Sequence, residues 1–188
     1  MSTTIETAGP DDARALAHVA AATFPLACPP GTRLEDIAAH VTRHLSPDAF
    51  RRHLADPART LLLAVGDVAG EAPDGTRDVL GYAMLVTGEP DDPGIAAALT
   101  VRPTVLLDKF YLLPTAQGTG TADLLLAEAM RTAAATGASG LWLGVNRQNA
   151  RAARFYERHG LRVVGARRFT VGSVEHEDDV RELVLDDR

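Results

Sequence analysis

The sequence predicts an α/β fold in which a mixed, mostly antiparallel central sheet of about seven strands carries helices on both faces. The predicted elements run in the order strand, two or three helices, three strands, helix, strand, helix and two strands. The strand–helix–strand unit from Val105 to Val145 requires a parallel strand pair and a right-handed crossover, whereas the predicted hairpins give antiparallel neighbours.

Length and composition fit one globular domain spanning residues 1–188. No apolar run approaches the roughly 20 residues of a membrane-spanning helix, and the N-terminus lacks a secretory signal. We therefore expect a cytoplasmic protein with no membrane partner. A formal net charge of −6 argues against nucleic acid as a main partner. Cys28 stands alone, which excludes an internal disulfide and a cysteine-rich metal site.

Local signals divide the first half of the chain into a strand, three helices and two strands. Pro25 is expected to end the first helix. Thr32 and Glu35 have the spacing of a capping box for the second helix, and Ser46 before a proline is a typical cap for the third. We expect a strand at 3–7, helices at 10–23, 32–44 and 46–55, and strands at 60–65 and 79–86, joined by a loop at 70–77.

The second half alternates strands and helices after an irregular insert at 88–98. Pro114 ends an apolar, β-prone run, and Gly137 is placed to end the long helix that follows. We expect strands at 105–113, 141–145, 161–169 and 180–185, helices at 118–136 and 150–159, and an acidic loop at 175–179.

A glycine turn joins the strand at 105–113 to the helix at 118–136. The first N–H groups of a helix lack intrahelical acceptors and carry the positive end of its dipole, so this turn has the layout of an anion-binding cradle. Gly118 and Gly120 allow a phosphate to approach without a Cβ in the way. Asp123 replaces the third glycine of the dinucleotide pattern, and the P-loop lysine is absent. A tight strand–helix connection without a ligand is the alternative.

Two motifs resemble those of the GNAT superfamily of acyl-CoA N-acyltransferases. The run Gln117-Gly118-Thr119-Gly120-Thr121-Ala122 resembles its Gln/Arg-x-x-Gly-x-Gly/Ala signature, and the run from Asn149 through Phe155-Tyr156 to Leu161 resembles its second hallmark. Together they cover about residues 105–161, which the resemblance identifies as the coenzyme A-binding core. Segments 45–57 and 169–172 are also loosely similar to bacterial polyamine-acetyltransferase-like members. An ordinary helix N-cap at Asn149 and core packing of the two aromatic residues are the alternatives.

The resemblance implies an N-acetyltransferase that passes an acetyl group from acetyl-CoA, without a metal, directly to a primary amine of a small molecule or peptide. It assigns the coenzyme pyrophosphate to the backbone amides of the glycine turn and the pantetheine to the end of the preceding strand. The implied coenzyme-binding residues are Tyr111, Leu112, Leu113, Gln117, Gly118, Thr119, Gly120, Thr121, Ala122, Asn149 and Tyr156.

The same resemblance implies the catalytic residues. Asp108 occupies the position of a strand glutamate in many members, where it would remove the proton of the attacking ammonium, and Tyr156 would protonate the leaving thiolate. The alternative for Asp108 is a solvated carboxylate paired with Lys109 or Arg102. Glu175 and His176 are weaker candidates for the base.

Several alternatives stay open from the sequence alone. The chain could be a catalytically weak acyl-CoA-binding or regulatory module, or a nucleotide-binding Rossmann-like domain. His40 and His44 lie four residues apart on one helix face, which favours a surface pair over a zinc site because the glutamate of His-Glu-x-x-His is absent. Acidic residues at Glu35, Asp36 and 175–179 would suit a polyamine or aminoglycoside, or form a solvated face. Exposed strand edges favour a homodimer.

Overall fold

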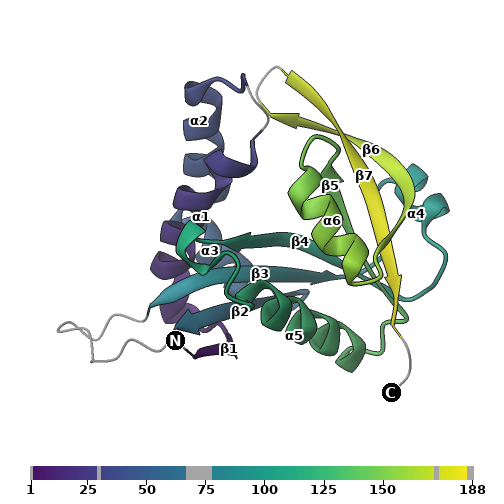
Figure 1. Cartoon of the computed structure of the whole chain (residues 1–188), viewed down its shortest axis with the longest axis horizontal. Coiled ribbons are helices and arrows are strands. Elements are labelled where there is room, and N and C mark those ends of the chain that lie inside the picture. The colour runs from purple at the N-terminus through teal and green to yellow at the C-terminus, as the bar shows by residue number, and fades with distance from the viewer. Residues whose placement is uncertain (1, 29–30, 67–77, 172–173, 186–188) are drawn as a thin grey trace.

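A computed structural model describes residues 2–28, 31–66, 78–171 and 174–185 (Figure 1). Within these residues, seven strands form one sheet in the order β1-β2-β3-β4-β5-β7-β6. Neighbouring strands are antiparallel except β4 and β5, which run parallel. The strands are β1 (Thr3–Thr7), β2 (Arg59–Gly66), β3 (Val79–Thr87), β4 (Thr104–Leu112), β5 (Gly140–Asn146), β6 (Arg162–Val171) and β7 (Val174–Val184). The predicted α/β class and its mostly antiparallel sheet are confirmed.

Helices cover both faces of the sheet, as predicted (Figure 1). They are α1 (Ala13–Ala27), α2 (Leu34–His44), α3 (Pro47–Ala55), α4 (Pro93–Ala98), α5 (Thr121–Ala135) and α6 (Ala150–Arg158), with 3-10 turns η1 (Pro10–Asp12) and η2 (Pro114–Ala116). Leu61 and Leu63 of β2 pack against α1–α3, while Leu62 between them packs against α5 and α6 on the opposite face. This alternation follows from the two-residue period of a strand.

Two expectations for the early helices are wrong. Helix α1 continues through Pro25 to Ala27. In its last turn the proline removes a single backbone hydrogen bond, and the neighbouring Phe24 is buried, with its ring stacked on that of His40 at a centroid distance of 4.4 Å. The N-cap of α2 is Arg33 rather than Thr32, and its side chain makes no capping hydrogen bond. Ser46 caps α3 as predicted, because its hydroxyl accepts from the Ala49 N–H at 3.3 Å.

The expected irregular insert and acidic loop also differ. The insert contains α4, because the Asp92 carboxylate accepts the N–H groups of Gly94 and Ile95 at 2.7 and 3.1 Å. The acidic segment belongs to β7, where Asp178 and Asp179 pair in register with Asn146 and Val145 of β5. Strand pairing and nearby arginines outweigh the weak strand propensity of aspartate there. The expected loop at 70–77 lies outside the described residues.

The sheet opens between β4 and β5. Their parallel pairing is confined to residues 104–106 of β4 and 140–142 of β5. On its other edge β4 stays paired with β3, but the register shifts: Met84 lies opposite Lys109, and Leu85 lies opposite Leu107. Asp108 is the extra residue of this β-bulge, a feature that bends a strand and re-aims its side chains. The bulge and the end of β5 pairing therefore occur at the same point. Among the described residues, no helix is long and apolar enough to cross a membrane.

Candidate active site

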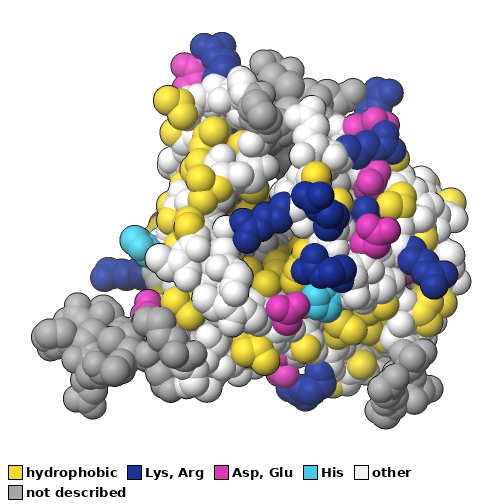
Figure 2. All heavy atoms as spheres, viewed as in Figure 1, with side chains coloured by type: hydrophobic (Ala, Val, Ile, Leu, Met, Phe, Trp, Pro, Cys, Tyr) yellow, Lys and Arg dark blue, Asp and Glu magenta, His cyan; other side chains and the backbone are white. Residues whose placement is uncertain are grey.

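A cleft of about 590 Å³ lies where β4 and β5 separate. Its walls come from β4, from β5 and α6 on one side, and from α1, α2 and α3 on the other. Figure 2 shows an apolar hollow near the centre of this face with Lys and Arg side chains around it. The lining includes Asp108, Tyr111, Asn149 and Tyr156, four residues that the sequence placed in the site.

The predicted glycine cradle has the backbone conformation that an anion site requires. Gly118 and Gly120 have φ values of +79° and +87°, and Gly120 is the N-cap of α5. A Cβ built on either glycine meets no heavy atom within 4 Å, so the space above the turn is open. Thr119 donates to the Ala116 carbonyl at 2.8 Å, and its hydroxyl lies 2.8 Å from that of Thr121. These hydrogen bonds of the two hydroxyl groups stabilise the turn.

The cradle and α6 are joined by a direct contact. The guanidinium of Arg151 donates to the side-chain oxygen of Gln117. Arg151, Arg154 and Arg158 recur at i, i+3 and i+7 and are all exposed, so they form one basic face of α6. Sequence reasoning missed this face, although the spacing of the arginines indicates it. It brings positive charge next to the end of α5 that is already suited to an anion.

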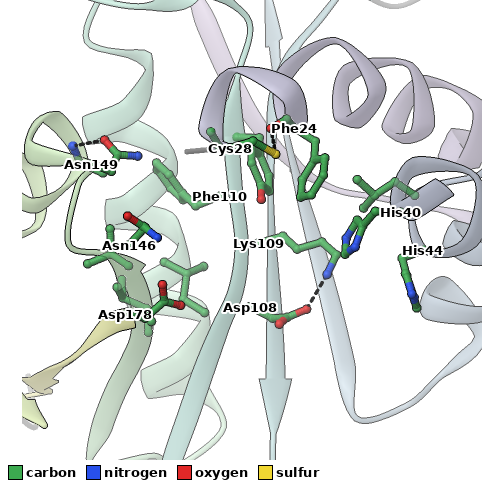
Figure 3. A pocket seen from close by; sticks show the side chains of 18 of the residues that line it. Phe24, Cys28, His40, His44, Asp108, Lys109, Phe110, Asn146, Asn149 and Asp178 are labelled. Atoms are coloured by element: carbon green, nitrogen blue, oxygen red, sulfur yellow. Dashed lines mark hydrogen bonds and ion pairs between the residues drawn. The ribbon is translucent and has the colours of Figure 1, made fainter. Parts of the chain in front are cut away.

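Asn149 serves both as a helix cap and as part of the cleft wall. Its side-chain oxygen accepts from the Ala152 N–H at 3.1 Å, which confirms the N-cap interpretation. The same side chain lines the cleft beside Asn146 (Figure 3). The N-cap role of Asn149 therefore does not exclude a role in the cleft wall, because the cap uses only one end of the side-chain amide.

Tyr156 is buried, at 8% exposure, yet it contributes to the lining of the cleft. Its ring packs edge-on against Phe155 and Phe110, with centroid distances of 5.4 and 6.2 Å. Burial raises the pKa of the phenol well above its usual value, and the nearby Tyr111 raises it further. The hydroxyl is therefore protonated at neutral pH and can donate a hydrogen bond or proton into the cleft.

Tyr111, Leu112 and Leu113 differ in their relation to the cleft. Tyr111 lines it and stacks on Tyr82. Leu112 packs with the α5 core, and the Leu113 N–H donates to the Leu80 carbonyl at 2.8 Å. Because the Leu113 N–H is already hydrogen-bonded, the part of β4 that lacks a neighbouring strand lies earlier in β4, where β5 no longer pairs with it.

Asp108 lies at the cleft wall in a salt bridge with its neighbour. The Lys109 ammonium is 2.7 Å from the Asp108 carboxylate, whose side chain is 31% exposed (Figure 3). Pairing with Lys109 was one of the alternatives foreseen for this residue, whereas Arg102 pairs with Glu89. The carboxylate is thus both partly accessible and already partnered.

Three histidines form much of the opposite wall, which the sequence did not predict. His40, His44 and His53 line the cleft from α2 and α3, and Figure 3 shows His40 close to Lys109. Burial is the main cause that lowers the pKa of His40 and of His53, and the charge of Lys109 lowers both further. The charge of His44 also lowers the pKa of His40. The charges of Arg59 and Arg52 also lower the pKa of His53, whereas the charge of Asp108 raises it. His40 is half-buried and His44 is exposed, and both line the cleft.

Metal and covalent chemistry find little support in this cleft. No group of three or more candidate metal ligands occurs among the described residues. Burial raises the pKa of the Cys28 thiol, which donates to the Phe24 carbonyl at 3.4 Å, so the thiolate is disfavoured. The side chains of Glu175 and His176, the weaker base candidates, lie outside the described part of the structure.

Comparisons with known proteins agree on a family. The model of the acetyltransferase (GNAT) family matches residues 30–161 of the chain. An uncharacterised N-acetyltransferase of Mycobacterium tuberculosis (strain ATCC 25618 / H37Rv) is 44% identical over 176 residues, which cover 92% of this chain and 99% of that protein.

Solved structures extend the similarity of fold. The PaiA N-acetyltransferase from Thermoplasma acidophilum, solved in complex with coenzyme A, has a TM-score of 0.73 at 21% identity, covering 98% of this chain and 99% of that one. NAA60 from Arabidopsis thaliana, solved in complex with acetyl-CoA, has a TM-score of 0.75 at 14% identity, with the same coverages.

Proposed function

The chain belongs to the acetyltransferase (GNAT) family, and we propose that it transfers an acetyl group from acetyl-CoA directly to the primary amine of a small molecule or peptide. The observation that carries the proposal is the cleft between the diverging strands β4 and β5, beside a glycine cradle at the N-terminus of α5. An anion site next to an open strand edge suits a ligand with a pyrophosphate at one end and a hydrogen-bonding chain at the other.

The residues present fit acetyl-CoA. The backbone amides of residues 118–122 would hold the pyrophosphate, and the basic face of α6 would add charge complementarity. Residues 107–111 of β4 have lost their partner on the β5 side, so backbone groups there are available to the pantetheine. Bound acetyl-CoA would supply the thioester as an activated acyl donor.

Tyr156 is our candidate for the proton donor. Burial raises its pKa, so the phenol is protonated at neutral pH and can donate a hydrogen bond to a leaving thiolate. A thiolate leaving group, with a pKa of about 8.5 in model thiols, is stabilised by such a hydrogen bond. The aromatic packing of Tyr156 against Phe155 holds the ring in place.

Asp108 is our candidate for the group that receives the ammonium proton. An alkyl ammonium has a pKa of about 10.4 and must lose a proton before its nitrogen can attack. The bulge presents Asp108 at the cleft wall, and its partial exposure allows a water molecule to extend its reach. The salt bridge with Lys109 also favours a second candidate function, an acyl-CoA-binding module without a competent base.

Calorimetry with acetyl-CoA, followed by measurement of thiol release with a panel of amines, distinguishes the two functions. An enzyme releases coenzyme A only when an amine is added, and mass spectrometry finds the acetylated amine. Binding without amine-dependent release supports the module. If the wild type binds no acetyl-CoA and Gly120→Trp, which fills the cradle, changes nothing, both functions are refuted.

A further inference from the structure

Among the described residues two carboxylates line the cleft, and both are occupied by partners. Asp108 is paired with Lys109 at 2.7 Å, and Asp178 is paired with Arg167 at 3.2 Å. A third cation, Arg59, also lines the cleft. The described part of the lining therefore has three fixed cations and two fixed anions, and Arg59 is paired with Asp56 at 2.9 Å, although the whole chain has a formal net charge of −6.

The histidine wall adds no negative charge either. His40 and His53 are half-buried, and the lowered pKa of each keeps the imidazole neutral at pH 7. Of the acidic residues that the sequence offered for a cationic acceptor, Asp178 lines the cleft but is paired with Arg167, whereas Glu35 is an exposed partner of Arg33 and neither Glu35 nor Asp36 lines the cleft.

The remaining lining on the acceptor side is apolar and aromatic. Phe24, Ala27 and Leu45 come from α1 and the α2–α3 connection, and Tyr111 faces them from β4. The parallel stack of Phe24 on His40 makes a flat surface. These walls favour an apolar body on the amine and add no charged partner for a second ammonium.

We propose that the acceptor is a monoamine with an apolar or aromatic body, and that the cleft selects against diamines and polyamines. This inference rests on the proposed function. A second ammonium would lose water in this cleft, and among the described residues no unpaired carboxylate lines the cleft to compensate for that loss. Both a free alkylamine and a peptide N-terminus with an apolar first side chain have the required chemistry.

The test compares hexylamine with hexane-1,6-diamine, which have the same six-carbon chain. We expect the wild type to favour the monoamine in kcat/KM by about tenfold or more. Lys109→Met should move this ratio toward the diamine by at least about fivefold, because it removes one positive charge from the lining of the cleft. Any loss of general catalysis in the variant affects both amines and cancels in the ratio.

Arg131→Met is the matched control. It also breaks a salt bridge, the exposed pair of Arg131 with Glu128 on α5, but this pair lies outside the cleft lining. The ratio should stay at its wild-type value. Leucyl-diglycine against lysyl-diglycine repeats the comparison at a peptide N-terminus and distinguishes a peptide acceptor from a free amine.

Equal or better use of the diamine by the wild type would overturn the inference, as would an unchanged ratio in Lys109→Met. If neither amine is acetylated although acetyl-CoA binds, the proposed function fails. In that case calorimetric binding of the two amines to the coenzyme A complex decides the selectivity, and tighter binding of the diamine overturns it.

Discussion

Replacing Gly120 by alanine separates ligand binding from backbone strain, because the chain offers a matched glycine. Gly120 and Gly137 have φ values of +87° and +80°, and a Cβ on either meets no heavy atom within 4 Å. Gly120 opens α5 in the cradle, whereas Gly137 follows the other end of that helix, about 22 Å away for 15 residues. Both substitutions thus impose the same strain, but only one places a methyl group in the cradle.

The magnitudes follow from these positions. A non-glycine residue in the left-handed region costs roughly 1–2 kcal/mol, so both variants should melt a few degrees below the wild type. In Gly120→Ala the methyl group hinders one hydrogen bond from an N–H group to a phosphate. Hydrogen bonds to charged groups contribute about 1.5–3 kcal/mol each, so the Kd for acetyl-CoA should rise about tenfold to a hundredfold.

Calorimetry with acetyl-CoA and thermal melting of the free proteins measure the two effects separately. We expect both variants to lose similar stability, while Gly137→Ala keeps the wild-type Kd. Similar losses of affinity in the two variants, or none in Gly120→Ala, would refute the cradle as the pyrophosphate site.

Three further predictions address the acid, the histidines and the sheet. Tyr156→Phe should lower kcat by about tenfold or more with little change in the Kd for acetyl-CoA, and equal turnover would remove Tyr156 from the mechanism. Wild-type stability in urea should fall as the pH drops below 6.5, because unfolded histidines protonate there while His40 and His53 stay neutral to lower pH. Their double substitution by glutamine should flatten this slope, and an unaltered slope would contradict the lowered pKa values. Gly81→Ala should cost about 1–3 kcal/mol on thermal unfolding, because its Cβ would lie 2.6 Å from the Tyr111 carbonyl oxygen, and a neutral result would contradict that close approach.

Most elements could be predicted because their ends depend on nearby residues. The proline after β4, the serine cap of α3 and the glycine before α5 each act within one turn of the chain. The errors occurred where distant contacts overrule such signals. Packing of Phe24 carries α1 past Pro25, and pairing with β5 makes a strand of the acidic segment.

The candidate site divides in the same way. The cradle and the start of α6 are continuous segments, so their motifs can be read directly. Asn149 and Tyr156 were found for this reason. The acceptor wall is assembled from α1, α2 and α3, and no local pattern indicates that His40 and His53 face β4.

By itself the sequence determined the order of most elements, the glycine turn before α5 and the resemblance to an acyltransferase family, because these depend on neighbours along the chain. Only the tertiary structure decided that β4 and β5 part after residue 106, that the bulge presents Asp108 to Lys109, and that the cleft carboxylates are all paired. The separation of β4 from β5 and the bulge depend on strand register between segments far apart in the chain, and that register places the paired carboxylates in the wall of the cleft.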